Sequence, residues 1–295
     1  MTQHQEEAAQ EGTTLPINSP DVFLPTELLA TLSHELRSPL AIIKGYVTSL
    51  LLYDQMITPE ERLDFLHSIN EGSDRLAQTI DRILELTQLE NGSVIIRPAL
   101  VDLFQLLRTV TEEVEQEQAI LQREHAVNLR QIQADGTTTA EDYLVLAEQP
   151  RLHTAFKNLL DNAFKYSPTG SPIDITIMPV QREQVSKHLK PSLNGRADTS
   201  ELLSVTIRDY GNGIPPDQLE RIFERLHRIE MNLIHEIHGL GLGLTISKHI
   251  IELHHGTIWA ESTLGSGSTF SVILPRTTET TLAQNTYLIH NTVKD

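Results

Sequence analysis

Apolar residues recur at helical spacing over two long stretches near the start of the chain. The first runs from about residue 25 to 53, and its spacings of three, four and seven residues are typical of a coiled coil or helical bundle. Its apolar positions are Leu29, Leu32, Leu36, Ile43, Val47 and Leu50. The second stretch ends near Glu90 and carries Leu66, Ile69, Leu76, Ile80 and Ile83. Each stretch therefore predicts an amphipathic helix.

The break between the two stretches carries the signals of a helix start. Thr58 is the expected N-cap, Pro59 falls in the first turn, and Glu61 completes a capping box. Asn91 and Gly92 are typical of a helix end. Two helices with one apolar face each predict a hairpin that dimerises into a four-helix bundle. A helical linker that only dimerises is the simpler alternative.

The pattern changes after residue 93, where short apolar runs alternate with helical segments. Strands are expected at 94–96, 127–132, 143–147, 173–177, 202–208, 256–261 and 268–274, and helices at 102–120, 149–166 and 240–254. Residues 180–200 are polar and predict a long surface loop. The mixture indicates an α+β chain whose second half is an α/β sandwich, a mixed sheet with helices on one face.

These patterns divide the chain into four parts. Residues 1–24 are polar and contain prolines, so we expect a disordered lead-in. The helical hairpin occupies 25–91 and the sheet-containing domain 92–276. Residues 277–295 are expected to be a flexible tail.

Composition excludes some classes of function. Among 295 residues, 40 Asp and Glu outnumber 23 Lys and Arg, giving a formal net charge of -17. Such a chain has no diffuse attraction for nucleic acid or anionic lipid. It contains no cysteine, which excludes disulfides and thiolate metal sites. No run approaches the ~20 apolar residues of a membrane span. We therefore expect a cytoplasmic protein without a direct membrane span, or the soluble output half of a longer one.

His34 is the candidate reactive group of the first helix. It lies two residues from both Leu32 and Leu36, so at about 100° per residue it points roughly 200° away from the apolar face, toward solvent. Glu35 can orient the ring or take its proton, which leaves one ring nitrogen as a nucleophile. Pro39 is expected to bend the helix just beyond. A surface histidine beside a surface glutamate is the ordinary alternative.

A second cluster falls on the predicted helix 149–166. Asn158, Asn162 and Lys165 have i, i+4 and i+7 spacing and so share one face. Two amides and an ammonium group suit a hydrated Mg²⁺ ion and phosphate oxygens. Ordinary polar positions on a helix are the alternative.

Two glycine-rich motifs follow. Asp209 ends a predicted strand, and Gly211 and Gly213 come after it. A carboxylate there can accept a hydrogen bond from an exocyclic amine, while glycines let the backbone approach a flat ring. A plain glycine turn is the commoner source of such a motif.

The second motif consists of Gly239, Gly241 and Gly243, which open the next predicted helix. Glycines at a helix N-terminus expose backbone N–H groups to phosphate. The chain lacks the Gly-x4-Gly-Lys-Ser/Thr pattern, so this is not a P-loop.

Taken together, the order of these motifs resembles the sensor histidine kinases of two-component systems over about residues 25–275. The resemblance implies a dimeric hairpin followed by an ATP-binding domain of the gyrase, heat-shock-protein, histidine-kinase and mismatch-repair type. It implies that His34 accepts the γ-phosphoryl group of ATP with Mg²⁺, that Glu35 orients or deprotonates the ring, and that the phosphoryl group passes to an aspartate of a response-regulator receiver domain.

The same resemblance implies roles for the second domain. Asn162 is the expected Mg²⁺ ligand, with Asn158 and Lys165 near the phosphates and Tyr166 packed by the nucleotide. Asp209 is expected to bind adenine in a pocket shaped by Gly211 and Gly213. The lid is expected to begin at a hinge with Phe223 and Arg225 and to end at the phosphate-facing Gly239, Gly241 and Gly243.

Some positions depart from the family pattern. Leu226 and His227 stand where two aromatic residues are common, and Leu240 replaces a small polar residue. Ser38 stands where threonine or asparagine often supports dephosphorylation of the partner. A catalytically weak dimeric scaffold that binds ATP or a receiver domain is therefore the alternative hypothesis. A related ATPase or protein-serine kinase is a third.

Overall fold

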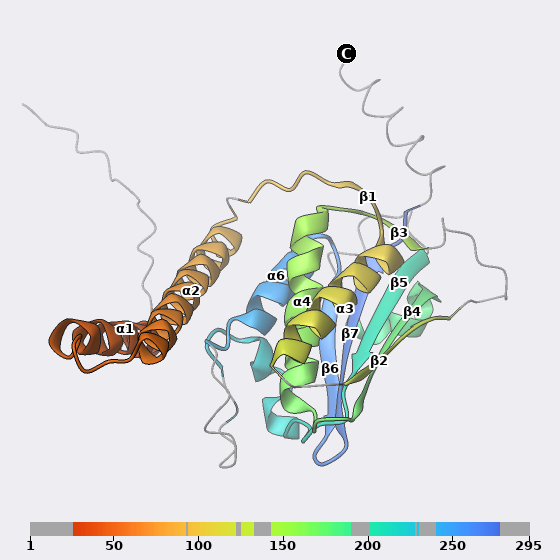
Figure 1. The fold of residues 1–295 in the computed structure, drawn as a ribbon. Coiled ribbons are helices and arrows are strands. Elements are labelled where there is room, and N and C mark those ends of the chain that lie inside the picture. Colours follow the sequence, from red (N-terminus) through yellow and green to blue (C-terminus); the bar gives the residue numbers. More distant parts are fainter. Residues whose placement is uncertain are drawn as a thin grey trace, which may run out of the picture.

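The computed structural model describes residues 26–92, 94–121, 125–132, 143–189, 201–227, 229 and 240–277 (Figure 1). The side chains of residues 26–31 and of His34 fall outside this description. So do the predicted lead-in over 1–24 and all but the first residue of the predicted tail. That residue, Thr277, donates its backbone N–H to the carbonyl of Leu144 at 2.8 Å.

The first unit is the predicted hairpin, formed by α1 (Thr26–Leu52) and α2 (Pro59–Glu90). The predicted capping box is confirmed, because Thr58 Oγ1 accepts from Glu61 N at 3.2 Å and Glu61 Oε2 accepts from Thr58 N at 2.9 Å. Asn91 is the C-cap of α2, and Gly92 follows with a φ of 60°. These local signals fix the length of α2 and therefore the reach of the hairpin.

The two helices run antiparallel. Tyr46 of α1 and Phe65 of α2 have ring centroids 4.9 Å apart. Gly72 of α2 is buried against α1, where a Cβ atom would lie 2.8 Å from Ile43 Cγ1 and 3.4 Å from the carbonyl oxygen of Pro39. Pro39 lies inside a continuous α1 and cannot donate a backbone hydrogen bond.

One hairpin leaves part of each apolar face uncovered. Val47 is 38% exposed, Leu66 50% and Ile80 44%. A second hairpin could cover these exposed apolar side chains, as happens in a four-helix bundle.

The second unit is a five-stranded sheet in the order β2-β4-β5-β7-β6. Its strands are β2 (Ala126–Gln131), β4 (Pro172–Gln181), β5 (Glu201–Arg208), β6 (Thr257–Thr263) and β7 (Gly267–Pro275). β2 pairs with β4 in parallel, and the other neighbours are antiparallel. A separate two-stranded sheet pairs β1 (Ala99–Asp102) with β3 (Leu144–Ala147).

Three helices cover one face of the five-stranded sheet, as Figure 1 shows. They are α3 (Leu103–Ile120), α4 (Gln149–Tyr166) and α6 (Gly243–Leu253). Alternate β4 residues such as Ile173 and Ile175 are fully buried beneath them, together with Phe156 of α4. The predicted α+β class and the mixed sheet with helices on one face are therefore confirmed.

The hairpin also packs on the second domain. Leu86 and Leu89, in the last turns of α2, are buried in the same core as the sheet and its helices. Glu90 forms an ion pair with Arg225, and α2 contacts α6. The end of α2 is thus part of both units.

The prediction of a strand at 94–96 is wrong. Ile95 is 85% exposed and no strand is assigned before Ala99, whose partner is Ala147 of β3. An apolar run becomes a strand only where a neighbouring strand meets its backbone hydrogen-bonding groups. Here the chain pairs with a neighbouring strand only from Ala99 onward, five residues after the apolar run begins at Val94.

The prediction of a loop over 180–200 is wrong for its first nine residues. β4 continues to Gln181, and two short helical segments follow, α5 (Arg182–Val185) and the 3-10 turn η2 (Ser186–His188). They pack on the sheet face away from α4, where His188 stacks on Trp259 with ring centroids 4.1 Å apart. Residues 190–200 lie outside the described part of the chain.

The helix predicted from about residue 240 to 254 is present, but it starts three residues later than predicted. α6 begins at Gly243, because Gly241 adopts a left-handed φ of 66° that interrupts helical geometry.

Candidate functional site

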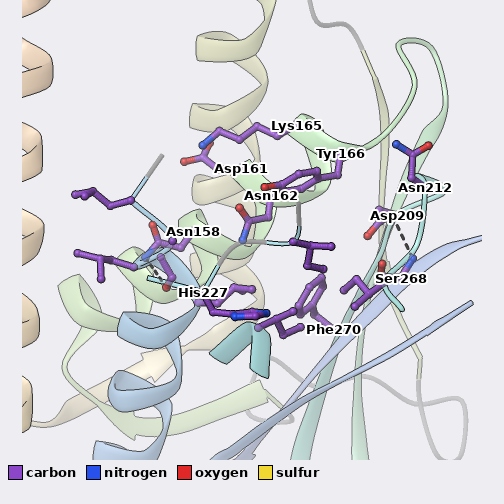
Figure 2. A pocket seen from close by; sticks show the side chains of 18 of the residues that line it. Asn158, Asp161, Asn162, Lys165, Tyr166, Asp209, Asn212, His227, Ser268 and Phe270 are labelled. Carbon is purple, nitrogen blue, oxygen red and sulfur yellow. Dashed lines mark hydrogen bonds between the residues drawn. The ribbon is translucent and has the colours of Figure 1, made fainter. Parts of the chain in front are cut away.

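A pocket lies beside α4 and collects side chains from segments far apart in the sequence (Figure 2). α4 contributes Asn158, Asp161, Asn162, Lys165 and Tyr166; the segment after β5 contributes Asp209, Asn212, Gly213 and Ile214. Leu240–Leu244, Ser268 and Phe270 of β7, Ile222, His227, Ile229, and Arg82 of α2 complete the lining. The pocket therefore joins residues of all three groups predicted in the second domain: the cluster on α4, the motif after Asp209 and the described part of the second glycine-rich motif.

The polar face of α4 lines the pocket as its spacing predicts. Asn158, Asn162 and Lys165 lie along it, while Phe156 and Leu160 are fully buried on the opposite side. Figure 2 shows Asn158 near one end, Asn162 and Tyr166 in the middle, and Asp209 at the other end. The amphipathic pattern of α4 thus sets the direction of its polar groups.

Asp209 is buried, with 4% of its surface exposed. Its Oδ1 accepts backbone hydrogen bonds from Gly211 at 2.9 Å and Ser268 at 3.1 Å. Burial raises the pKa of the Asp209 carboxyl, and the backbone N–H groups of Gly211 and Ser268 oppose that rise. The Ser268 side chain also hydrogen-bonds this carboxyl, so its position beside the pocket is held by several donors.

The two glycines after Asp209 lie where backbone segments approach too closely for a side chain. A Cβ atom on Gly211 would lie 2.2 Å from the carbonyl oxygen of Tyr166, and one on Gly213 would lie 2.2 Å from that of Thr263. Gly213 also has a φ of 71°. Gly267, which the sequence analysis did not single out, has a φ of 91° and would place a Cβ atom 2.1 Å from the carbonyl oxygen of Asp209.

The remaining predicted glycines differ from one another. Gly241 has a left-handed φ of 66°, and a Cβ atom there would lie 2.8 Å from the carbonyl oxygen of His227. A Cβ atom on Gly243 would meet only Asn158 atoms, at 3.6 Å, which is ordinary contact. Gly239 lies outside the described residues. Of the two described glycines of this motif, Gly241 alone is required by both its φ and its crowding.

The start of α6 faces the pocket through Gly243 and Leu244. Leu242, the N-cap residue, makes no side-chain cap hydrogen bond. The first N–H groups of a helix have no partner within the helix, and they suit an anion. Asn158 Nδ2 donates to the carbonyl of Gly243 at 3.4 Å, and Ser247 Oγ donates to the carbonyl of Ala155 at 3.1 Å. These bonds fix the α6 terminus against α4.

Asp161 is a pocket residue to which the sequence analysis gave no role. Burial raises the pKa of its carboxyl, and the positive charges of Lys165, Lys157 and Arg82 oppose that rise. Figure 2 shows Asp161 beside Lys165, on the side of the pocket away from Asp209. Ionisable groups of both signs therefore gather at this side.

The pocket lining is compatible with the Mg²⁺ ion that the resemblance implies. Asn162 is half-buried on the lining, and its side-chain amide forms no hydrogen bond within the described part of the chain. No group of three or more His, Cys, Asp or Glu side chains that could hold a metal occurs among the described residues. Mg²⁺ typically takes one or two protein oxygens and completes its octahedron with phosphates and water, which matches this arrangement.

Glu35 is not among the residues that line the pocket. His34 lies on α1, and nothing is described of its side chain; Glu35 is half-buried on the same helix. Of the predicted hinge residues, Phe223 is buried, and Arg225 pairs with Glu90 of α2.

The departures from the family pattern have structural counterparts. Leu226 adopts a left-handed φ of 55°, and His227 Nε2 lies 2.7 Å from Gln218 Oε1. Leu240 and Leu242 are buried, with 4% and 2% of their surfaces exposed. The described C-terminal end of the predicted lid is thus held by the buried side chains of Leu240 and Leu242. The rest of the predicted lid, Arg228 and residues 230–239, lies outside the described residues.

Two family descriptions match the chain. The phospho-acceptor domain called His Kinase A matches residues 26–92, and the histidine kinase-, DNA gyrase B- and HSP90-like ATPase matches residues 147–278. Among curated proteins, Drug sensory protein A of Synechocystis sp. is 31% identical over 245 residues, covering 83% of this chain and 34% of that protein. Sensor histidine kinase WalK of Bacillus subtilis is 26% identical over 252 residues, covering 84% and 36%.

Solved structures share the fold. The Acinetobacter baumannii histidine kinase AdeS superposes with a TM-score of 0.57 at 21% identity, covering 82% of this chain and 98% of that one. Full-length ShkA in complex with AMPPNP gives a TM-score of 0.54 at 24% identity, covering 86% and 47%. The chain spans about a third to a half of the length of the curated relatives it matches. Within the described ranges, no helix combines the length and apolar character needed to cross a membrane.

Proposed function

Since the chain belongs to the sensor histidine kinases, we propose that it is an ATP-dependent protein-histidine kinase that autophosphorylates His34. The observation that carries the proposal is the pocket, where Asn158, Asn162 and Lys165 of one helix face Asp209 and the start of α6. Adenine binds at Asp209 and the phosphates lie toward α6. Because the reaction consumes ATP, the proposal places both domains in the cytoplasm.

Each pocket group has a stated task in this proposal. Asp209 accepts from the adenine amine, and the contacts of Gly211 and Gly213 keep that loop in place. Lys165, Asn158 and the α6 N–H groups bind phosphate oxygens, which suits a reaction governed by positioning and charge neutralisation. Asn162 is the residue that would hold Mg²⁺, and the bound ion would supply positive charge beside the phosphates. Tyr166, 47% exposed at the rim, covers the nucleotide.

His34 is the proposed phosphoryl acceptor. One ring nitrogen attacks the γ-phosphorus, ADP leaves, and Glu35 takes or holds the other ring proton. The phosphoryl group then passes to an aspartate of a response-regulator receiver domain that docks on the hairpin. Two chains pair through the apolar faces that one hairpin leaves uncovered, so the active species is a homodimer.

The test uses the full chain with γ-labelled ATP and Mg²⁺. We expect wild type to acquire label that is lost in acid and stable in base, as a phosphoramidate is. His34→Gln should acquire none yet still bind ATP, whereas Asn162→Ala should lose Mg²⁺-dependent labelling. His67→Gln, which removes an exposed histidine of α2, is the matched control and should label normally. Acid-labile label on His34→Gln would refute the site assignment, and a wild type that binds ATP without labelling would favour the scaffold hypothesis.

A further inference from the structure

Arg82 of the hairpin helix α2 lines the pocket in the second domain. It is half-buried, and its positive charge acts on Asp161 of α4. No ion pair or hydrogen bond of the Arg82 side chain is found within the described residues. An arginine with unused donors at the lining of a pocket is suited to an anionic ligand.

The packing of α2 explains why this side chain reaches the pocket. Arg82, Leu86 and Leu89 have i, i+4 and i+7 spacing and therefore lie on one face of α2. Leu86 and Leu89 are buried in the core of the second domain. Glu90 continues the same contact with its ion pair to Arg225. The docked end of α2 thus carries Arg82 to the side of the pocket where Asp161 lies.

We infer that Arg82 binds a phosphate group of the bound nucleotide, so that a nucleoside di- or triphosphate fastens the hairpin to the ATP-binding domain. The inference rests on the proposed ATP site. A guanidinium group offers paired donors that match two phosphate oxygens, and such charge-assisted bonds are stronger than neutral ones. Lys165 supplies a second cation from α4, so phosphates between them are bound by both units.

The register of the hairpin relates this contact to His34. Gly72 lies against Pro39, and the helices run antiparallel. Counting five residues back from Pro39 and five on from Gly72 places His34 level with about residue 77. Arg82 is five residues further, which is about 7.5 Å along α2 at ~1.5 Å per residue. Nucleotide bound by Arg82 therefore holds the phosphates within about two helical turns of the His34 level on the hairpin.

The test compares nucleotide affinity of full-length wild type, Arg82→Ala and Arg82→Lys. Arg75→Ala is the matched control, because Arg75 lies two turns earlier on α2, is 61% exposed and pairs with Glu71. We expect Arg82→Ala to weaken ATP and ADP binding roughly tenfold, the factor expected for one charge-assisted bond, and to change adenosine binding less than about twofold. Arg82→Lys should restore part of the ATP affinity, and Arg75→Ala should bind like wild type.

Hydrogen exchange gives a second readout on the same proteins. ATP should slow exchange of backbone amides in residues 80–90 of wild type, and this protection should be lost in Arg82→Ala. Equal losses for ATP and adenosine would overturn the inference and leave Arg82 a docking residue only. Unchanged ATP affinity in Arg82→Ala would also overturn it, while wild-type labelling at His34 would still support the proposed function. A wild type that binds no ATP would overturn both.

Discussion

Asn158 donates its side-chain amide to the backbone carbonyl of Gly243 at 3.4 Å, and this bond joins the polar face of α4 to the first residue of α6. The contact leaves the N–H groups of the α6 terminus directed at the same pocket as Lys165. The glycines of the site are not equivalent, because a Cβ atom has room at Gly243 but not at Gly211.

The first prediction separates these glycines. Gly211→Ala places a methyl group 2.2 Å from the backbone oxygen of Tyr166, and relieving that clash must move the loop that holds Asp209. A displacement that costs about 1–3 kcal/mol corresponds to roughly a 5- to 150-fold loss in ATP affinity. Gly243→Ala should stay within a few-fold of wild type. Titration with a fluorescent ATP analogue measures both, and equal affinities for the two variants would contradict the assignment of Gly211.

The second prediction concerns Asp209→Asn. The asparagine oxygen can keep both backbone hydrogen bonds from Gly211 and Ser268, but its amide group presents donors to the adenine amine. We expect ATP affinity to fall at least about tenfold, while the melting temperature at pH 7 equals or exceeds that of wild type, because a buried charge has been removed. Calorimetry measures binding and melting together. A variant that binds adenosine like wild type would argue against Asp209 as the adenine ligand.

The third prediction is a pH dependence set by the same carboxyl. The folded-state pKa of Asp209 is raised above its ordinary 3.8 by burial. Between 3.8 and the raised value, the folded chain keeps a proton that the unfolded chain has released, so stability from this group falls as pH rises through that window. The ionised form is the one that accepts from adenine. Adenosine affinity should therefore fall as pH is lowered toward that window.

Adenosine is the probe for that experiment because it has no phosphates that titrate. Asp209→Asn supplies the control, since its residual binding should show no such decline. A wild-type affinity that is constant down to the ordinary carboxyl pKa would refute the prediction.

The fourth prediction concerns His254, which is buried between α6 and the start of α4. Its Nε2 accepts from the backbone N–H of Glu148 at 3.0 Å, and its Nδ1 lies 2.8 Å from the carbonyl of Ile250. This arrangement requires the neutral ring, and burial lowers the pKa of His254 below its ordinary 6.5. The unfolded chain takes up the proton first, so the stabilising effect is full above pH 6.5 and is lost as pH falls below it.

We expect the free energy of unfolding of wild type to decline from pH 7 to pH 5 more steeply than that of His254→Gln. Urea unfolding at several pH values measures the slopes. His67→Gln, altered at an exposed position of α2, should keep the wild-type slope. Parallel slopes for wild type and His254→Gln would show that His254 does not titrate in this range.

Local chemistry in the sequence was sufficient for several elements. The Thr58–Glu61 capping box and Asn91–Gly92 mark both ends of α2 because they are satisfied within one turn of the chain. The polar face of α4 was predictable because a single periodicity separates Asn158 and Asn162 from the buried Phe156. The strand prediction at 94–96 failed because pairing depends on a partner that a single segment does not reveal.

Parts of the site were not predictable for a related reason. Gly267 and Ser268 lie about sixty residues after Asp209 and reach it because β6 and β7 form a hairpin. Neither residue type predicts that contact from the sequence. Arg82 belongs to a different unit and reaches the pocket only because Leu86 and Leu89 dock α2 there. The roles proposed for all of the predicted site residues, from His34 to Gly243, stay predictions.

The crowding of backbone around Asp209 has an evolutionary consequence. Gly211, Gly213 and Gly267 each touch a carbonyl oxygen, so almost any substitution there must move main chain rather than a side chain. The lid end, where Leu226 and Leu240 replace other residue types, packs through side chains that can be exchanged. Under the proposed function, sequence change should therefore accumulate at the exchangeable side chains of the lid end, with Gly241 excepted, and less often around Asp209.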